Sequence, residues 1–85
     1  MKLNFEKTHV DAVLPTKNHK EDTGMDVTSV EDIVIPARES AVVDVGLKFA
    51  FIEKGYWVKV EGRSGLGFKH GIMPHPGIID EGYRG

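Results

Sequence analysis

The chain has 85 residues, a net charge of −2 at pH 7 and no cysteine. Its length allows at most one small domain, covering residues 1–85, and the missing thiols exclude disulfides and zinc sites built on thiolates. Its slightly negative charge argues against binding of nucleic-acid polymers, and no apolar run reaches the roughly 20 residues of a membrane span.

Apolar runs ended by glycine or proline follow one another along the chain, and they predict an all-β fold. The runs expected to form strands cover residues 33–35, 41–45, 47–52 and 56–61. Two further apolar pairs, Ile72-Met73 and Ile78-Ile79, enclose the expected tight end of a hairpin at 74–77. Turn residues recur about every 8–12 positions, which is typical of sandwiches and barrels. Helical periodicity is nearly absent.

The roughly six expected strands are fewer than a closed sheet usually needs. Unpaired strand edges are normally covered or paired in natural proteins. We therefore expect the fold to be C-terminally incomplete in this chain, or to be completed by other subunits.

Residues 62–65 combine two glycines with two hydrogen-bond donors. Gly62 and Gly65 could adopt the positive φ angles of an anion-binding nest, while Arg63 and Ser64 could bind phosphate oxygens. The alternative is an ordinary turn with a solvent-facing arginine, and composition alone favours it. The spacing is not that of a P-loop.

Asp80 and Tyr83 follow the apolar pair Ile78-Ile79 on a short glycine-containing segment. A carboxylate at the end of a buried strand can be held rigidly and partly desolvated, which suits a general base. Tyr83 could stack on a base or contact a sugar. The alternative interpretation, in which Asp80 caps a turn and Tyr83 packs in the core, is equally compatible with these residues.

Asp26 is a weaker candidate, for a hydrated metal ion. Mg²⁺ prefers oxygen ligands and commonly keeps waters between itself and a carboxylate, although acids near glycine usually mark turns. The four histidines lack metal-ligand spacing. Trp57 and Phe49 alternate with polar neighbours and are expected in the core rather than at a ligand.

The order of three segments resembles the first three motifs of the trimeric dUTP diphosphatases (dUTPases). The segments are TGMDV at 23–27, GRSGLGFKHG at 62–71 and GIIDEGYRG at 77–85. The similarity runs from about Leu3 to Gly85, and motifs four and five of the family are absent from this chain. The departure within the matched region is Pro74, near which the family commonly has asparagine or a small residue.

The resemblance implies a jelly-roll-like β-clip fold and a cytoplasmic homotrimer with shared active sites, or one in the host cytoplasm if the gene is viral. It further implies Mg²⁺-assisted hydrolysis of dUTP to dUMP and pyrophosphate. That reaction removes uracil nucleotides from DNA precursors and supplies dUMP for thymidylate synthesis.

The resemblance also implies roles for individual residues. Asp80 would orient the water that attacks the α-phosphorus, and Tyr83 would lie beneath the deoxyribose. The implied substrate and metal contacts are Arg63, Ser64 and Gly65 for phosphates, Gly77, Ile78 and Ile79 for the uracil hairpin, and Asp26 for the metal through water.

Two other functions remain open on this reading. One is a non-catalytic relative that binds nucleotides or a partner, although such a protein would not need Asp80 beside Tyr83. The other is a dCTP deaminase-like enzyme on the same fold, for which the 77–85 segment is a poorer match.

Overall fold

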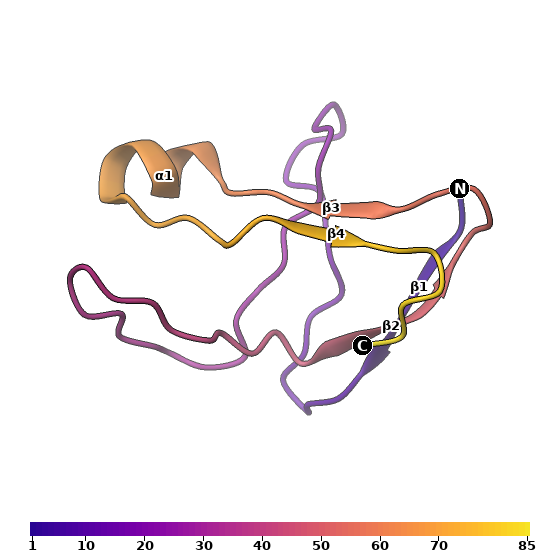
Figure 1. Cartoon of the computed structure of the whole chain (residues 1–85), viewed down its shortest axis with the longest axis horizontal. Coiled ribbons are helices and arrows are strands. Elements are labelled where there is room, and N and C mark those ends of the chain that lie inside the picture. Colours follow the sequence, from indigo (N-terminus) through magenta and orange to yellow (C-terminus); the bar gives the residue numbers. More distant parts are fainter. The chain divides into compact units, whose positions relative to one another are not determined.

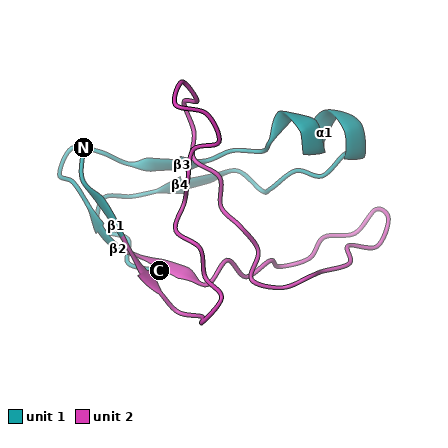
Figure 2. Ribbon diagram, turned by 180° about the vertical axis from the view of Figure 1, so that it is seen from behind, with its two compact units in different colours: residues 1–4, 50–85 teal, residues 5–49 magenta.

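The computed structural model describes all residues, 1–85, which form two compact units (Figure 2). The first unit comprises Met1–Asn4 and Ala50–Gly85, and the second comprises Phe5–Phe49. The expected single domain over residues 1–85 stays a prediction. No helix of the structure has the length and apolar character that a membrane crossing requires.

Strands dominate the regular structure, with one short helix among them (Figure 1). The elements in chain order are β1 (Leu3–Lys7), β2 (Leu47–Ile52), β3 (Val58–Val60), α1 (Ser64–His70) and β4 (Gly77–Ile79). β1 pairs with β2, and β3 pairs antiparallel with β4. The all-β class is thus confirmed, with α1 as an element that the periodicity did not indicate.

The β1–β2 pair is stabilised by contacts between alternating side chains. The ring centroids of Phe5 and Phe49 lie 5.1 Å apart, and the Lys48 ammonium lies 3.6 Å from the Glu6 carboxylate. Aromatic and opposite-charge pairs across neighbouring strands each stabilise a sheet modestly. The strand expected at 47–52 is therefore confirmed, and Phe49 is half-buried as expected of a packed ring. β1 was not expected, although its Leu-Asn-Phe-Glu alternation is a strand signal.

The strands expected at 33–35 and 41–45 are absent. The two segments flank a turn in which Glu39 N–H bonds to the Pro36 carbonyl at 3.1 Å, and Arg38 adopts a positive φ of 66°. A single backbone bond, from Val30 N–H to the Asp44 carbonyl at 3.0 Å, replaces a ladder. The prediction was wrong because apolar composition favours a strand only where another strand pairs with it.

Gly46 lies directly before β2, and three residues from other parts of the chain pack closely around it. It is buried, with φ of 65°. A Cβ atom here would lie 2.8 Å from His9 Cβ, 2.9 Å from Val30 Cγ1 and 3.0 Å from Ala12 Cβ. Both the left-handed backbone and the lack of space therefore require glycine.

Few side chains are fully buried. Ala12 and Ile52 are the buried apolar residues, whereas Trp57, which was expected in the core, is 57% exposed. Trp57 precedes β3 and is not part of its ladder, so the alternation that suggested burial has no facing strand to pack against.

Candidate functional site

The β3–β4 ladder determines where the candidate residues of the first unit lie. Val58 pairs with Ile79, Lys59 with Ile78 and Val60 with Gly77. Because the strands are antiparallel, the chain leaves β3 toward Arg63 at one end of the pair and leaves β4 toward Asp80 at the other (Figure 1). The phosphate-binding candidates and the Asp80–Tyr83 segment are therefore at opposite ends of this ladder within one chain.

The ladder also corrects the expected hairpin. Ile78 and Ile79 pair with β3 and not with Ile72 and Met73, which lie outside any strand. Strands joined through α1 and the 72–76 segment form the pair instead of a tight hairpin.

Arg63, Ser64 and Gly65 form the start of α1 rather than a nest. Arg63 is the extended residue that precedes the helix, with φ of −84° and ψ of 135°. The glycines with positive φ are Gly46, Gly55 and Gly71, so neither Gly62 nor Gly65 has the nest conformation. The nest, which composition alone did not favour, is not observed. Ser64 and Gly65 keep backbone N–H groups that have no acceptor within the helix.

α1 ends in a well-defined cap at Gly71, which has φ of 65°. Gly71 N–H bonds to the Gly67 carbonyl at 3.1 Å, which is the single bond of the αL capping motif. Ile72 N–H bonds to the Leu66 carbonyl, also at 3.1 Å. Lys69 and His70 lie in the last turn, where cations are favoured by the helix dipole.

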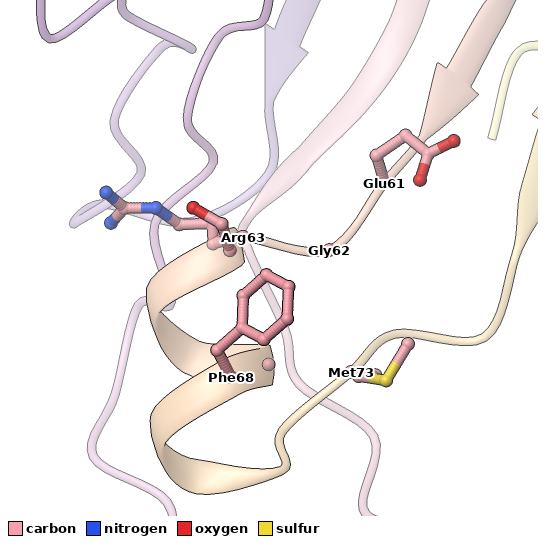
Figure 3. A pocket seen from close by; sticks show the side chains of 7 residues that line it. Glu61, Gly62, Arg63, Phe68 and Met73 are labelled. Carbon is pink, nitrogen blue, oxygen red and sulfur yellow. The ribbon is translucent and has the colours of Figure 1, made fainter.

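A pocket of about 340 Å³ lies beside the start of α1 (Figure 3). Phe68 of α1 and Met73 of the following segment face the same space, whereas the Arg63 guanidinium extends away from Met73 and Glu61. The residues that line the pocket are Glu61, Gly62, Arg63, Ser64, Gly67, Phe68 and Met73. The pocket thus combines the apolar side chains of Phe68 and Met73 with polar residues that include the Glu61 carboxylate.

The segment after β4 is a turn held by several hydrogen bonds. Tyr83 N–H donates to the Asp80 carbonyl at 3.0 Å. Arg84 Nη1 donates to the Glu81 carbonyl at 2.9 Å and to the Tyr83 carbonyl at 2.8 Å. Glu81 Oε2 accepts from Gly55 N–H at 3.2 Å, which connects this turn to the one before β3.

Asp80 and Tyr83 are both solvent-exposed. Tyr83 is 52% exposed, and Asp80 follows a strand whose Ile78 is itself 66% exposed. The expected partial desolvation of Asp80 is therefore not observed, and neither is the packing of Tyr83 in the core. The two side chains are available to an external molecule, on a turn whose backbone is hydrogen-bonded.

Asp26 belongs to the second unit, whereas the other candidate residues belong to the first. Its N–H donates to the Thr16 carbonyl at 2.8 Å, and its carbonyl accepts from Thr16 N–H at 3.2 Å. This isolated bridge holds Asp26 half-buried. No group of three or more His, Cys, Asp or Glu side chains is arranged to hold a metal ion.

Comparison of the sequence with known proteins identifies the family of this chain. The dUTPase family model matches residues 10–85. The chain belongs to the dUTPase family. The match includes all three segments on which the resemblance was based, and it agrees with the all-β dUTPase fold that the sequence predicted.

Several curated relatives are similar to the whole chain and have names that belong to the same family. Deoxyuridine 5'-triphosphate nucleotidohydrolases from Nautilia profundicola and Clostridium novyi are 45% and 44% identical to it, over 100% of the chain and 61% of each relative. The enzyme of that name from Solibacter usitatus is 42% identical, over 100% of the chain and 60% of the relative. The chain thus spans about 60% of the length of these relatives.

Sequence reasoning missed three residues that shape the site. Glu81, Arg84 and Gly55 supply the hydrogen bonds around the Asp80–Tyr83 turn. Gly55 had a usable signal, because glycine after a lysine between two strands commonly adopts positive φ in a turn. The partnership of Glu81 with Gly55 had none, since the residues are 26 positions apart.

Proposed function

We propose that this protein hydrolyses dUTP to dUMP and pyrophosphate. The observation that carries the proposal is the dUTPase-family match over residues 10–85, which includes an exposed Asp80 and Tyr83 on a hydrogen-bonded turn. The names of the relatives, deoxyuridine 5'-triphosphate nucleotidohydrolases, support the same substrate.

The reaction requires a positioned water and stabilisation of charge on the phosphates. In the proposal, the Asp80 carboxylate accepts a hydrogen bond from the water that attacks the α-phosphorus. The bond from that phosphorus to the bridging oxygen breaks, and pyrophosphate leaves with the electron pair. Asp80 takes the proton of the attacking water, so dUMP and pyrophosphate are the products.

Arg63, Ser64 and Gly65 are proposed to bind the phosphate chain. The guanidinium and the hydroxyl offer charged and neutral donors, and the Gly65 backbone can approach an oxygen closely because it has no side chain. Preorganised donors of this kind stabilise the transition state, in which charge develops on the phosphates, more strongly than they stabilise the bound substrate.

The backbone of Gly77, Ile78 and Ile79 is proposed to bind uracil. β4 has one neighbouring strand, β3, so its other edge is not paired within the sheet. Backbone groups along such an edge form hydrogen bonds with an extended partner or a base edge. Cytosine would exchange a donor for an acceptor and leave polar groups unpaired, which a hydrogen-bonding site rejects strongly. Pro74 contributes no N–H to this recognition.

The Tyr83 ring is proposed to lie against the deoxyribose. An aromatic ring packed on one face of the sugar leaves no space for a 2′-hydroxyl, so UTP would fit poorly. The exposure of Tyr83 agrees with this role.

Mg²⁺ fits the residues present only as a hydrated ion carried by the triphosphate. Asp26 offers one carboxylate, and no group of three or more His, Cys, Asp or Glu side chains is arranged to hold a metal ion. Mg²⁺ usually keeps several waters and binds through one or two carboxylates together with substrate phosphates. The ion would neutralise phosphate charge, and Asp26 would hold its hydration shell.

A homotrimer with shared sites is the proposed assembly. Within one chain, the Arg63–Gly65 segment and Asp80 leave the β3–β4 ladder at opposite ends. A site that needs both can be built from residues of more than one copy. Large apolar side chains that are almost fully exposed, including Val10, Val42 and Phe68, offer surface for such contacts.

Turnover of a nucleotide panel distinguishes the proposal from its competitors. We expect pyrophosphate release from dUTP with Mg²⁺ and little release from UTP or dCTP. Ammonia from dCTP would instead identify a deaminase. Binding of dUTP without turnover, measured by titration calorimetry, would identify a non-catalytic nucleotide-binding relative.

A further inference from the structure

Two turns lie at the same end of the β3–β4 ladder. The turn that precedes β3 is closed by Tyr56 N–H, which donates to the Glu53 carbonyl at 3.0 Å. The turn that follows β4 contains Asp80 and Tyr83. Since Val58 pairs with Ile79, the antiparallel register continues toward these two turns, and it brings residues 55–56 near residue 81.

Glu81 connects the two turns through its side chain. Its Oε2 atom accepts a hydrogen bond from Gly55 N–H at 3.2 Å. Gly55 has φ of 88°, which corresponds to the third residue of a type II turn. The hydrogen bond of that turn uses Tyr56 N–H, so Gly55 N–H is available to the carboxylate.

This contact differs from the hydrogen bonds that lie within the turn. Tyr83 N–H and Arg84 Nη1 donate to carbonyls of residues 80–83. They fix the shape of the turn but not its position against the ladder. β4 itself pairs over only three residues. The Glu81–Gly55 bond, in contrast, connects the turn to a separate segment.

We propose that Glu81 is a positioning residue, which holds the Asp80–Tyr83 turn in place through Gly55. This inference rests on the proposed function for its catalytic consequence, because Asp80 and Tyr83 act on dUTP only if that function is correct. Glu81 itself contacts neither the substrate nor the attacking water. Small displacements of a group that orients a reactant lower the rate of the chemical step strongly.

Three variants of the full 85-residue chain test the proposal. Glu81→Ala removes the acceptor, and Glu81→Gln keeps an amide oxygen at the same reach. Glu39→Ala removes an exposed carboxylate elsewhere and is the charge-matched control. If Glu81→Ala does not fold, Glu81→Asp replaces it, because aspartate keeps the charge but is one methylene too short.

The first readout is amide hydrogen exchange at Gly55 and Tyr83, measured by NMR. We expect exchange to accelerate about fivefold in Glu81→Ala, the effect of one lost hydrogen bond, and to remain near the wild-type rate in Glu81→Gln and Glu39→Ala. The second readout is steady-state dUTP hydrolysis. We expect kcat to fall about tenfold in Glu81→Ala with little change in KM, and to recover in Glu81→Gln.

The two readouts separate the inference from the proposed function. If the wild-type chain does not hydrolyse dUTP, the proposed function fails for this chain, and the exchange rates alone decide whether Glu81 positions the turn. Unchanged exchange in Glu81→Ala overturns the inference. Accelerated exchange with an unchanged kcat in an active enzyme also overturns it, because the turn would then not need this support for the reaction.

Discussion

A Cβ atom on Gly62 would lie 3.1 Å from Cδ of Pro74. The residue that precedes the phosphate-binding candidates is thus in close contact with the segment that precedes β4. Because Pro74 is rigid and has no N–H, its contribution here is packing, and glycine is the residue that permits it. This contact connects the residue just before Arg63 to the segment between α1 and β4.

Gly62→Ala tests that contact. The added methyl group would lie 3.1 Å from Cδ of Pro74, and this atom of a rigid ring would have to move by a few tenths of an ångström. We therefore expect a loss of stability of about 1 kcal/mol and weaker dUTP binding. Gly62→Ala combined with Pro74→Ala should recover most of the loss. Chemical denaturation and titration calorimetry on the four members of the cycle give the coupling energy, and strictly additive effects would contradict the contact.

Tyr83→Ala tests the proposed discrimination against ribose. Loss of the ring should bring the kcat/KM of UTP closer to that of dUTP by about tenfold or more, since it opens space for a 2′-hydroxyl. Tyr56→Ala is the matched control, because Tyr56 is similarly exposed at 47% but lies in the other turn. Equal selectivity in wild type and Tyr83→Ala would remove the ring from the sugar site.

Asp26→Asn tests the hydrated-metal role. A neutral amide should hold the hydrated ion less well, so we expect a higher Mg²⁺ concentration for half-maximal dUTP turnover, by about tenfold. Chelation by EDTA should abolish turnover in the wild type. Asp32→Asn, which removes an exposed carboxylate elsewhere in the second unit, should behave as wild type. An identical Mg²⁺ dependence in Asp26→Asn would exclude this residue.

Gly46→Ala tests the fold of the second unit. The methyl group would meet His9, Val30 and Ala12 on a backbone with positive φ, so we expect a destabilisation of about 2 kcal/mol or more. Gly24→Ala, where nothing lies within 4 Å, is the control. A thermal melt of each variant suffices. An unchanged midpoint for Gly46→Ala would show that the segment repacks freely.

Local pattern predicted part of the fold well. The run at 47–52 is almost entirely apolar and finds a partner in β1, so its strand formed as expected. The runs at 33–35 and 41–45 have similar composition but only one backbone bond between their neighbourhoods. Composition indicates which segments favour a strand. Whether a strand forms depends on which segments lie side by side in the fold, and composition does not determine this.

The helix was missed for a different reason. α1 is seven residues long and contains Gly65 and Gly67, which lower helix propensity. Its end is stabilised by the Gly71 cap, a feature that the sequence suggests only once a helix is assumed. Periodicity needs more than two turns to be recognised.

The candidate residues themselves were identified from the sequence, but their setting was not. Asp80 and Tyr83 were predicted as functional because of the segment around them, and the structure places both on an exposed turn. The bond between Glu81 and Gly55 depends on the β3–β4 register, which no local pattern determines. Contacts between residues far apart in the sequence can be identified only once the fold is known.

The most direct test of the account is pyrophosphate release from dUTP by wild type and Asp80→Asn, with dUTP binding measured on the same samples. The account predicts Mg²⁺-dependent turnover by the wild type. It predicts that Asp80→Asn still binds dUTP but has lost turnover by about a hundredfold or more. Turnover by Asp80→Asn at the wild-type rate would contradict the role of this carboxylate, and no turnover of dUTP by the wild type would contradict the proposed activity of this chain.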